Sequence, residues 1–175
     1  MKVHRIAIMA LMAAISIILA RFFAFMIGGT IRIAFDHAPL YLAGMLLGPL
    51  GGAMTGVVAD LVGILINPMG GFFPGFTLSY ALLGFIPGYL FKEVRLDRVS
   101  LKKVVITLLV TDIIVSVFMN TFWLSIMFGD AFWAILPARL VARAIIMPVQ
   151  IFFIYTLLNY VPVLPLERIN SRPRI

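Results

Sequence analysis

Apolar residues run in long stretches along this chain, and short groups of glycine, proline and charged residues separate them. By hydropathy the stretches cover five ranges, namely 6–27, 38–67, 72–91, 104–128 and 131–161. A transmembrane helix needs about 20 consecutive apolar residues, and every stretch reaches that length. The pattern therefore predicts an all-α integral membrane protein in which residues 1–175 form a single transmembrane domain.

The second stretch is too long for one ordinary span, and its middle reads Gly48-Pro49-Leu50-Gly51-Gly52. Proline removes a helical hydrogen bond, and glycine raises the entropic cost of ordering the backbone, so this cluster should break or bend a helix. Residues 38–67 therefore hold either one kinked helix or two short ones.

The basic residues decide between five spans and six. They gather at Lys2 and Arg5, in the segment 92–103, and in residues 168–174. Lysine and arginine accumulate on the cytoplasmic side of membrane proteins, and only six spans place all three groups there. We therefore predict six transmembrane helices with both termini in the cytoplasm and a ligand site open to the extracellular side. Residues 38–48 then form a short helix, and short helices interrupted by glycine and proline point to a transport site.

The composition supports this class and excludes others. The chain is 63% hydrophobic and only 12% charged, with a mean hydropathy of +1.12, which is more apolar surface than a soluble domain can bury. Its net charge of +7 follows from cytoplasmic loops, so we expect contact with membrane lipid and not with nucleic acid. The absence of cysteine and the wide separation of His4 from His37 predict no metal site.

The apolar stretches contain ionisable residues, each of which costs about 2.5 to 3.5 kcal/mol there and requires a partner or a function. Asp112 and Arg143 fall at a similar depth, which predicts a structural ion pair between two helices. Arg21, Asp60 and Arg139 fall nearer the outer surface. Two arginines against one aspartate favour an anionic ligand, because arginine binds carboxylates through two parallel hydrogen bonds. Alternatively, Arg21 and Arg139 extend toward the interface and keep their guanidinium groups in water.

Aromatic residues lie beside the predicted outer face, at Phe72, Phe73 and Phe76. Aromatic faces stack on planar heterocycles, so these side chains are candidate ligand contacts. The alternative is an aromatic belt at the membrane interface. Trp123 and Asn120 lie one helical turn apart and would face the same cavity, although the amide of Asn120 can equally bind a neighbouring helix.

Gly28 and Gly29 precede a short segment that carries Arg32 and ends at Asp36. This order predicts a hinge followed by an ordered loop, which would gate the cavity and bring Arg32 to the ligand. A solvated connector between two helices is the alternative interpretation.

Small residues mark one face of the first helix, where Ala7, Ala10 and Ala14 form a narrow stripe. Small residues allow another helix to approach closely, which makes this stripe a candidate assembly face for a partner protein. Packing within the chain itself explains the stripe almost equally well.

No motif of an enzyme or of an ATPase is present. The chain lacks the GxxxxGK[ST] loop that binds nucleotide phosphates, and it lacks a nucleophile elbow, an HExxH sequence and paired catalytic carboxylates. We therefore predict a binding protein without a cofactor of its own, and if it transports uphill, a partner supplies the energy. A membrane enzyme acting on a lipid or isoprenoid and a purely structural membrane subunit are the alternatives.

Three segments of the chain resemble one family. They lie in order between residues 28 and 150 and read IRIAFDHAPLYLAGMLLGPLGGAMTGVVADLVG, GGFFPGFTLSYALLGFIPG and NTFWLSIMFGDAFWAILPARLVARAIIMPVQ. They are similar to the substrate-binding S component of energy-coupling factor (ECF) transporters, most closely to its folate-specific group. The PGFTLS and LPARL sequences are the most specific parts of the resemblance.

This resemblance implies six helices in a bacterial plasma membrane and a vitamin site that faces outward. It also implies that the Ala10-x-x-x-Ala14 stripe docks on a transmembrane T component driven by two ATPases, so that only the partners use ATP. Folate is the vitamin implied, although related S components carry riboflavin, thiamine, biotin or pantothenate on one fold. Folate would place its rings on the phenylalanines, its glutamate on Arg32 and Arg139, and its pterin donors on Asp60.

Overall fold

Helices make up nearly all of the structure, a computed structural model that describes residues 2–27, 31–68, 72–91, 99–129 and 131–160. Four helical segments in these ranges are long and apolar enough to cross a membrane. The elements, in chain order, are α1 (Lys2–Arg21), β1 (Phe25–Ile27), β2 (Ile31–Ile33), α2 (His37–Ile66), α3 (Pro74–Leu90), α4 (Leu101–Thr111), the π-helix η1 (Asp112–Met119), α5 (Asn120–Phe128) and α6 (Phe132–Tyr160).

Helix α2 is broken where the sequence predicts it. Gly48 has φ 83° and ψ 177°, a conformation that glycine adopts without strain, and Pro49 follows it inside the element. The break exposes a carbonyl at Leu47, and Arg5 Nη2 from α1 donates to that oxygen at 2.6 Å. The predicted interruption of 38–67 is therefore confirmed, and a side chain of α1 satisfies one of the backbone groups that it frees.

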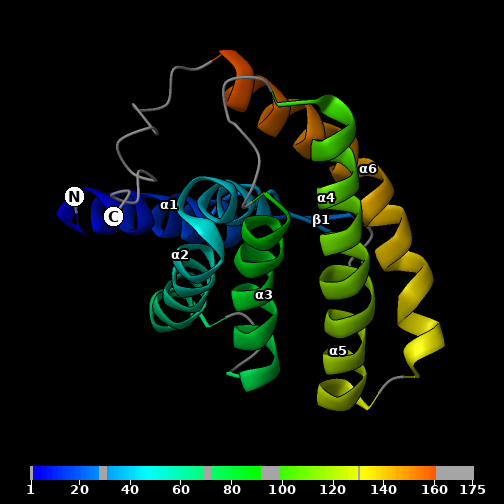
Figure 1. Cartoon of the computed structure of the whole chain (residues 1–175). Helices are drawn as coiled ribbons and strands as arrows, with labels where there is room; N and C mark the ends of the chain where they lie inside the picture. The colour runs from blue at the N-terminus through cyan, green and yellow to red at the C-terminus, as the bar shows by residue number, and fades with distance from the viewer. Residues whose placement is uncertain (1, 28–30, 69–71, 92–98, 130, 161–175) are drawn as a thin grey trace.

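Glycines bring α2 and α3 into backbone contact, and the two helices lie side by side in Figure 1. A Cβ atom added at Gly84 would collide with the backbone oxygen of Gly52, and one added at Gly44 would collide with the oxygen of Gly84. At Gly88 an added Cβ would lie 2.6 Å from the carbonyl carbon of Gly48. Because nothing larger than glycine fits, this interface has a single close-packed arrangement.

The segment from Leu101 to Phe128 forms one long rod beside α6, in which α4, η1 and α5 follow one another without a break (Figure 1). The rod ends at Gly129, whose φ of 74° allows its N–H to donate back to Ser125 O at 3.0 Å. Its middle eight residues are a π-helix, a rare form in which the backbone hydrogen bonds span five residues. Such segments are frequent at functional sites.

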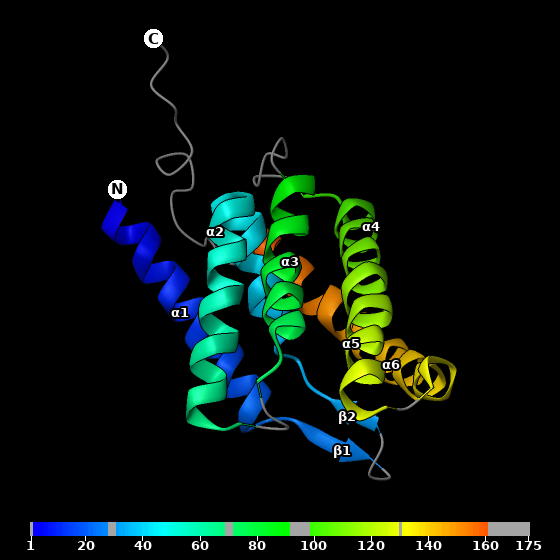
Figure 2. The same ribbon diagram turned by 90° about the horizontal axis from the view of Figure 1, so that it is seen from below.

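A small β-hairpin connects α1 to α2, where the sequence analysis predicted only an ordered loop. Strands β1 and β2 are antiparallel, with Arg32 opposite Met26 in the pairing. Figure 2 shows the hairpin extending from the end of α1 toward α5 and α6, and β2 contacts α6. The proposed hinge at Gly28 and Gly29 lies outside the described residues.

The two faces of α1 differ in what they contact. Ile8, Ala13 and Ile17 are buried against the rest of the protein. Ala7, Ala10 and Ala14 are exposed on the surface of the chain. The alanine stripe therefore does not pack inside this subunit, which removes the alternative explanation for it.

Candidate functional site

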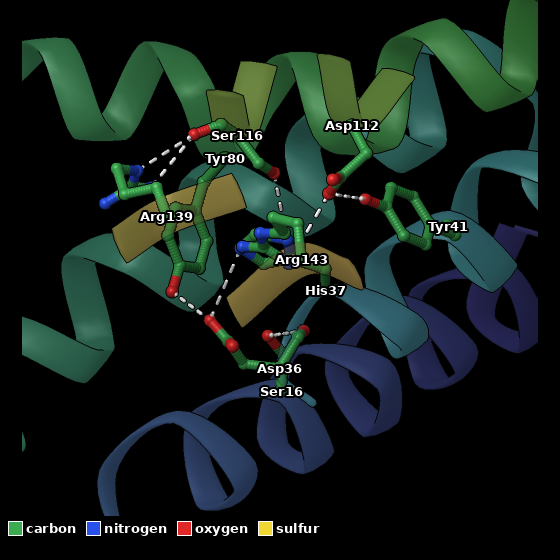
Figure 3. Close-up of polar contacts among 9 residues, drawn as sticks. All are labelled: Ser16, Asp36, His37, Tyr41, Tyr80, Asp112, Ser116, Arg139 and Arg143. Carbon is green, nitrogen blue, oxygen red and sulfur yellow. Dashed lines mark hydrogen bonds and ion pairs between the residues drawn. The ribbon is translucent and has the colours of Figure 1, made fainter. Parts of the chain in front are cut away.

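A layer of polar side chains joins η1 to α6 (Figure 3). Ser116 O, on η1, accepts hydrogen bonds from two nitrogens of Arg139 on α6, from Nε at 3.3 Å and from Nη2 at 2.9 Å. The hydroxyl oxygen of Ser116 lies 3.3 Å from His37 Nδ1 at the start of α2. One residue of the π-helix therefore connects the cation of α6 to the imidazole of α2.

His37 in turn contacts groups from the loop before α2 and from α3. Its Nε2 lies 3.8 Å from Asp36 Oδ2, which also accepts a hydrogen bond of 2.5 Å from the hydroxyl of Tyr80. The edges of the Tyr41 and Tyr80 rings meet the imidazole with centroid distances of 6.2 and 6.1 Å. Ser16 Oγ of α1 donates to the backbone oxygen of Asp36 at 2.8 Å. The network thus joins α1, α2, α3, η1 and α6.

The predicted ion pair between Asp112 and Arg143 is confirmed. Arg143 Nη1 lies 3.4 Å from Asp112 Oδ1, and the carboxylate is almost fully buried. Tyr41 donates a second contact to the same oxygen at 3.2 Å. A carboxylate buried in a membrane protein needs this kind of compensation, so we assign the pair to structure.

An aromatic group lies between α3 and α5. Phe73 packs against Phe76 and Trp123 with ring centroids 5.9 and 5.8 Å away, and the indole Nε1 donates to Ser79 Oγ at 3.2 Å. The rings approach closely because Gly75 has no side chain: an added Cβ would lie 2.5 Å from atoms of both Phe73 and Trp123. The structure therefore brings together three of the predicted contact residues.

Phe72 differs from its neighbours because 57% of it is exposed and it makes no ring contact with any residue that the structure describes. Its role as a ligand contact stays a prediction. For Arg32, only the backbone position in β2 is described. This position lies on the hairpin that contacts α6, the helix that carries Arg139.

Asp60 lies in the interface of α2 with α3. It is 4% exposed, and its Oδ2 accepts a hydrogen bond of 2.6 Å from Thr77. Arg21, predicted at a similar depth, donates from Nη1 to Asn67 O at 2.8 Å and so caps the end of α2. No hydrogen bond between described side chains links Asp60 to Arg139 or to Trp123.

Asn120 is the predicted contact with the most informative environment. It is 6% exposed, yet its Oδ1 has no hydrogen-bond partner among the residues that the structure describes. Asp112, Ser116 and Asn120 are all buried at intervals of four along the rod. A buried amide oxygen without a partner costs about 1 to 3 kcal/mol, so a ligand that donates to it would recover that energy.

Sequence reasoning missed Asp36, His37, Tyr80 and Ser116. A signal was available, because Asp36 and His37 are adjacent ionisable residues directly before an apolar stretch, and Tyr80 follows Thr77 and Ser79 in another. Among the described residues no group of three histidine, aspartate or glutamate side chains is positioned to hold a metal ion. The arrangement presents arginine, amide and aromatic groups, which suit an organic anion carrying rings.

Comparison with known proteins gives a consistent result. A family model described as ECF transporter, substrate-specific component, matches residues 4–158. The folate transporter FolT of Clostridium novyi (strain NT) is 36% identical over 154 residues, which cover 88% of this chain and 87% of that protein. FolT of Leuconostoc mesenteroides is 24% identical over 163 residues, covering 89% and 85%. A crystal structure of FolT bound with folic acid matches with a TM-score of 0.76 and 33% identity, covering 89% of this chain and 93% of that one.

Proposed function

The chain belongs to the substrate-specific components of ECF transporters, and from its likeness to FolT we propose that its ligand is folate. It is a transport component of the plasma membrane with several membrane helices, and not an enzyme. The observation that carries the folate assignment is the likeness of the whole fold to FolT bound with folic acid, at 33% identity over 89% of the chain. The side chains at the site agree with this ligand in chemistry.

Folate combines a pterin, a benzoate ring and a glutamate with two carboxylates. Arg139 and Arg32 would hold the glutamate, because a guanidinium forks onto a carboxylate. Phe72, Phe73, Phe76 and Trp123 would contact the rings, and Asn120 would receive a donor at its unpartnered oxygen. Asp60 uses Oδ2 for Thr77 and would accept from the pterin through Oδ1. These four kinds of contact support an affinity for folate over a simple dicarboxylate.

Titration of the purified full-length protein with folate, riboflavin, thiamine and pantothenate tests the assignment. We expect folate to bind with nanomolar-range affinity, about −12 kcal/mol, and the other vitamins to bind far more weakly. Calorimetry that found tight binding of a different vitamin and none of folate would refute the assignment and leave the family unaffected.

We also propose the six-span topology, with both termini in the cytoplasm and the site open to the outside. The break at Gly48 supports it, since it divides α2 into two segments that can cross as separate helices. The chain has no cysteine, so single introduced cysteines report cleanly on topology. An impermeant maleimide should label Asn67→Cys on intact cells, and should label Ser171→Cys only after the cells are opened. The reverse pattern would overturn the orientation.

The exposed alanines of α1 are the proposed docking face for a transmembrane T component, whose two ATPases would supply the energy from ATP. The chain itself then needs no cofactor. Replacing Ala10 or Ala14 with Trp should leave folate binding intact and abolish uptake by cells that contain the complex, because a bulky side chain prevents close helix approach. Ala134→Trp, at an exposed alanine on α6, is the matched control and should transport normally. Wild-type uptake by the α1 variants would refute this docking face.

A further inference from the structure

A groove lies on the outside of the molecule, where the end of α3 meets the start of α4. It has a volume of about 420 Å³, and the residues that line it differ from those of the polar layer in Figure 3. The described part of its walls consists of two lysines, two hydroxyl residues and two aliphatic residues, namely Lys102, Lys103, Ser100, Thr107, Leu90 and Ile106. None of these residues is used by the proposed folate site or by the alanine stripe.

The polar end of the groove carries two lysine charges that no described residue compensates. Lys102 and Lys103 are exposed, and neither makes an ion pair with any residue that the structure describes. The described lining contains no carboxylate. Ser100 precedes α4 but its side chain does not cap the helix, so the hydroxyl is available to another acceptor or donor. This end of the groove is therefore complementary to an anion.

The other end of the groove is apolar and continues along the surface. Leu90 is 36% exposed and Ile106 is 49% exposed. Beyond them the exposed aliphatic side chains of Leu109, Val110 and Ile113 follow the same rod toward its centre. In a protein whose outer surface faces lipid, these residues contact acyl chains. A ligand that fills the groove thus needs an anionic head and an aliphatic tail in one molecule.

We propose that this groove binds an anionic phospholipid, with its phosphate between Lys102 and Lys103 and an acyl chain along Ile106 and Leu90. Basic pockets between transmembrane helices recognise lipid headgroups in this way, through charge at the membrane surface and shape below it. A free phosphate would use the same lysines but would gain nothing from the aliphatic end. Substitutions at the polar end and at the aliphatic end of the groove can therefore distinguish a phospholipid from free phosphate.

The first experiment is a lipid titration of the full-length protein in neutral detergent, followed by native mass spectrometry. Phosphatidylglycerol should bind more tightly than phosphatidylcholine with the same acyl chains. The double variant Lys102→Gln, Lys103→Gln should lower the phosphatidylglycerol affinity about 30-fold, since each lysine beside an anionic headgroup contributes about fivefold. The variant Arg168→Gln, Arg172→Gln removes the same charge from the end of the chain and should retain wild-type affinity. Equal losses in both variants would show attraction by net charge alone and would overturn the proposal.

The second experiment changes shape and leaves charge unaltered. Ile106→Trp fills the aliphatic end of the groove at a half-exposed position, so the variant should fold and should bind folate as the wild type does. The wild-type protein should prefer phosphatidylglycerol to phosphatidylcholine, and in the Ile106→Trp variant this preference should fall by at least half. An unchanged lipid preference would contradict the binding of an acyl chain in this groove. Competition by inorganic phosphate as strong as by the lipid would show a free-anion site instead.

Discussion

The interface of α2 with α3 and the layer between η1 and α6 are built on opposite principles. Glycines bring the first pair of helices into backbone contact, with no room for an added methyl group at Gly44, Gly52 or Gly84. The second pair is held by polar side chains, and directly after η1 the Oδ1 atom of Asn120 lacks a partner among the described residues. The first interface is closed by backbone contact at its glycines, and the second contains a polar atom without a described partner.

This difference indicates a different role for each of the two interfaces. In lipid, close packing of small residues is a main source of helix association, so the α2–α3 pair can serve as a rigid support. Unpartnered polar groups are costly in the same environment, and they persist where a ligand or ordered water completes them. We therefore expect substitutions at the packed glycines of α2 and α3 to act on folding, and substitutions at Arg139 and Asn120 to act on binding.

The largest effect should come from breaking the glycine-packed interface of α2 with α3. Gly84→Leu forces α3 away from α2, because the new side chain would overlap the backbone of Gly52. We expect a loss of about 4 kcal/mol or more, enough to prevent accumulation of folded protein. Fluorescence-detected size exclusion would measure it, with the exposed alanine variant Ala134→Leu as the control. A monodisperse Gly84→Leu protein of normal thermal stability would contradict the rigid-support role.

The second-largest effect should come from breaking the buried ion pair between Asp112 of η1 and Arg143 of α6. Arg143→Ala leaves the Asp112 carboxylate buried and unpaired, which should destabilise the protein by about 3 to 5 kcal/mol. Replacing both residues with leucine removes the charge and should restore most of the stability. Unfolding in detergent mixtures measures both variants. If the single and double variants were equally unstable, the pair would have a role beyond charge compensation.

Arg139 separates binding from folding within the same layer. Arg139→Ala should weaken folate binding by about 2 to 5 kcal/mol, because a desolvated charge pair with the ligand is lost. Pteroate lacks the glutamate and should bind the wild type and the variant alike. Calorimetry with both ligands makes the comparison. Equal losses for folate and pteroate would mean that Arg139 acts through Ser116 on the site and does not hold the glutamate.

The smallest effect should come from Asn120. Replacing it with leucine removes a buried amide whose oxygen has no described partner, so the stability of the empty protein should change by about 1 kcal/mol or less. Folate affinity should nevertheless fall by about 1 to 3 kcal/mol. Thr111→Val, at a buried hydroxyl that donates to Thr107 O within its own helix, is the control and should leave affinity unchanged. A stability loss without an affinity loss would assign Asn120 to helix packing.

Local sequence patterns predicted the features that depend on few residues. The break at Gly48 follows from glycine and proline chemistry, and the Asp112–Arg143 pair follows from depth in the membrane. The contact of Phe73 with Phe76 and with Trp123 follows less directly, from the shared outer location of the two segments.

Other features depend on tertiary contacts that no local pattern encodes. The π-helix is one, since its residues are ordinary helix formers and Arg139 from another helix holds the carbonyl of Ser116. The meeting of Asp36, His37 and Tyr80 depends on how α2 enters the bundle after the hairpin. Asp60 was expected near a pterin, and only the structure places it opposite Thr77.

The π-helix η1 also affects how relatives should be aligned with this chain. A π-turn accommodates about one residue more than the α-turn it replaces, so it arises and disappears through single-residue insertions and deletions. A relative with an uninterrupted α-helix there would carry one residue fewer between its counterparts of Asp112 and Asn120. An alignment gap inside residues 112–119 would then mark the loss of the π-turn, and the side chains on either side of the gap would keep their orientation, because the wider turn absorbs the extra residue locally.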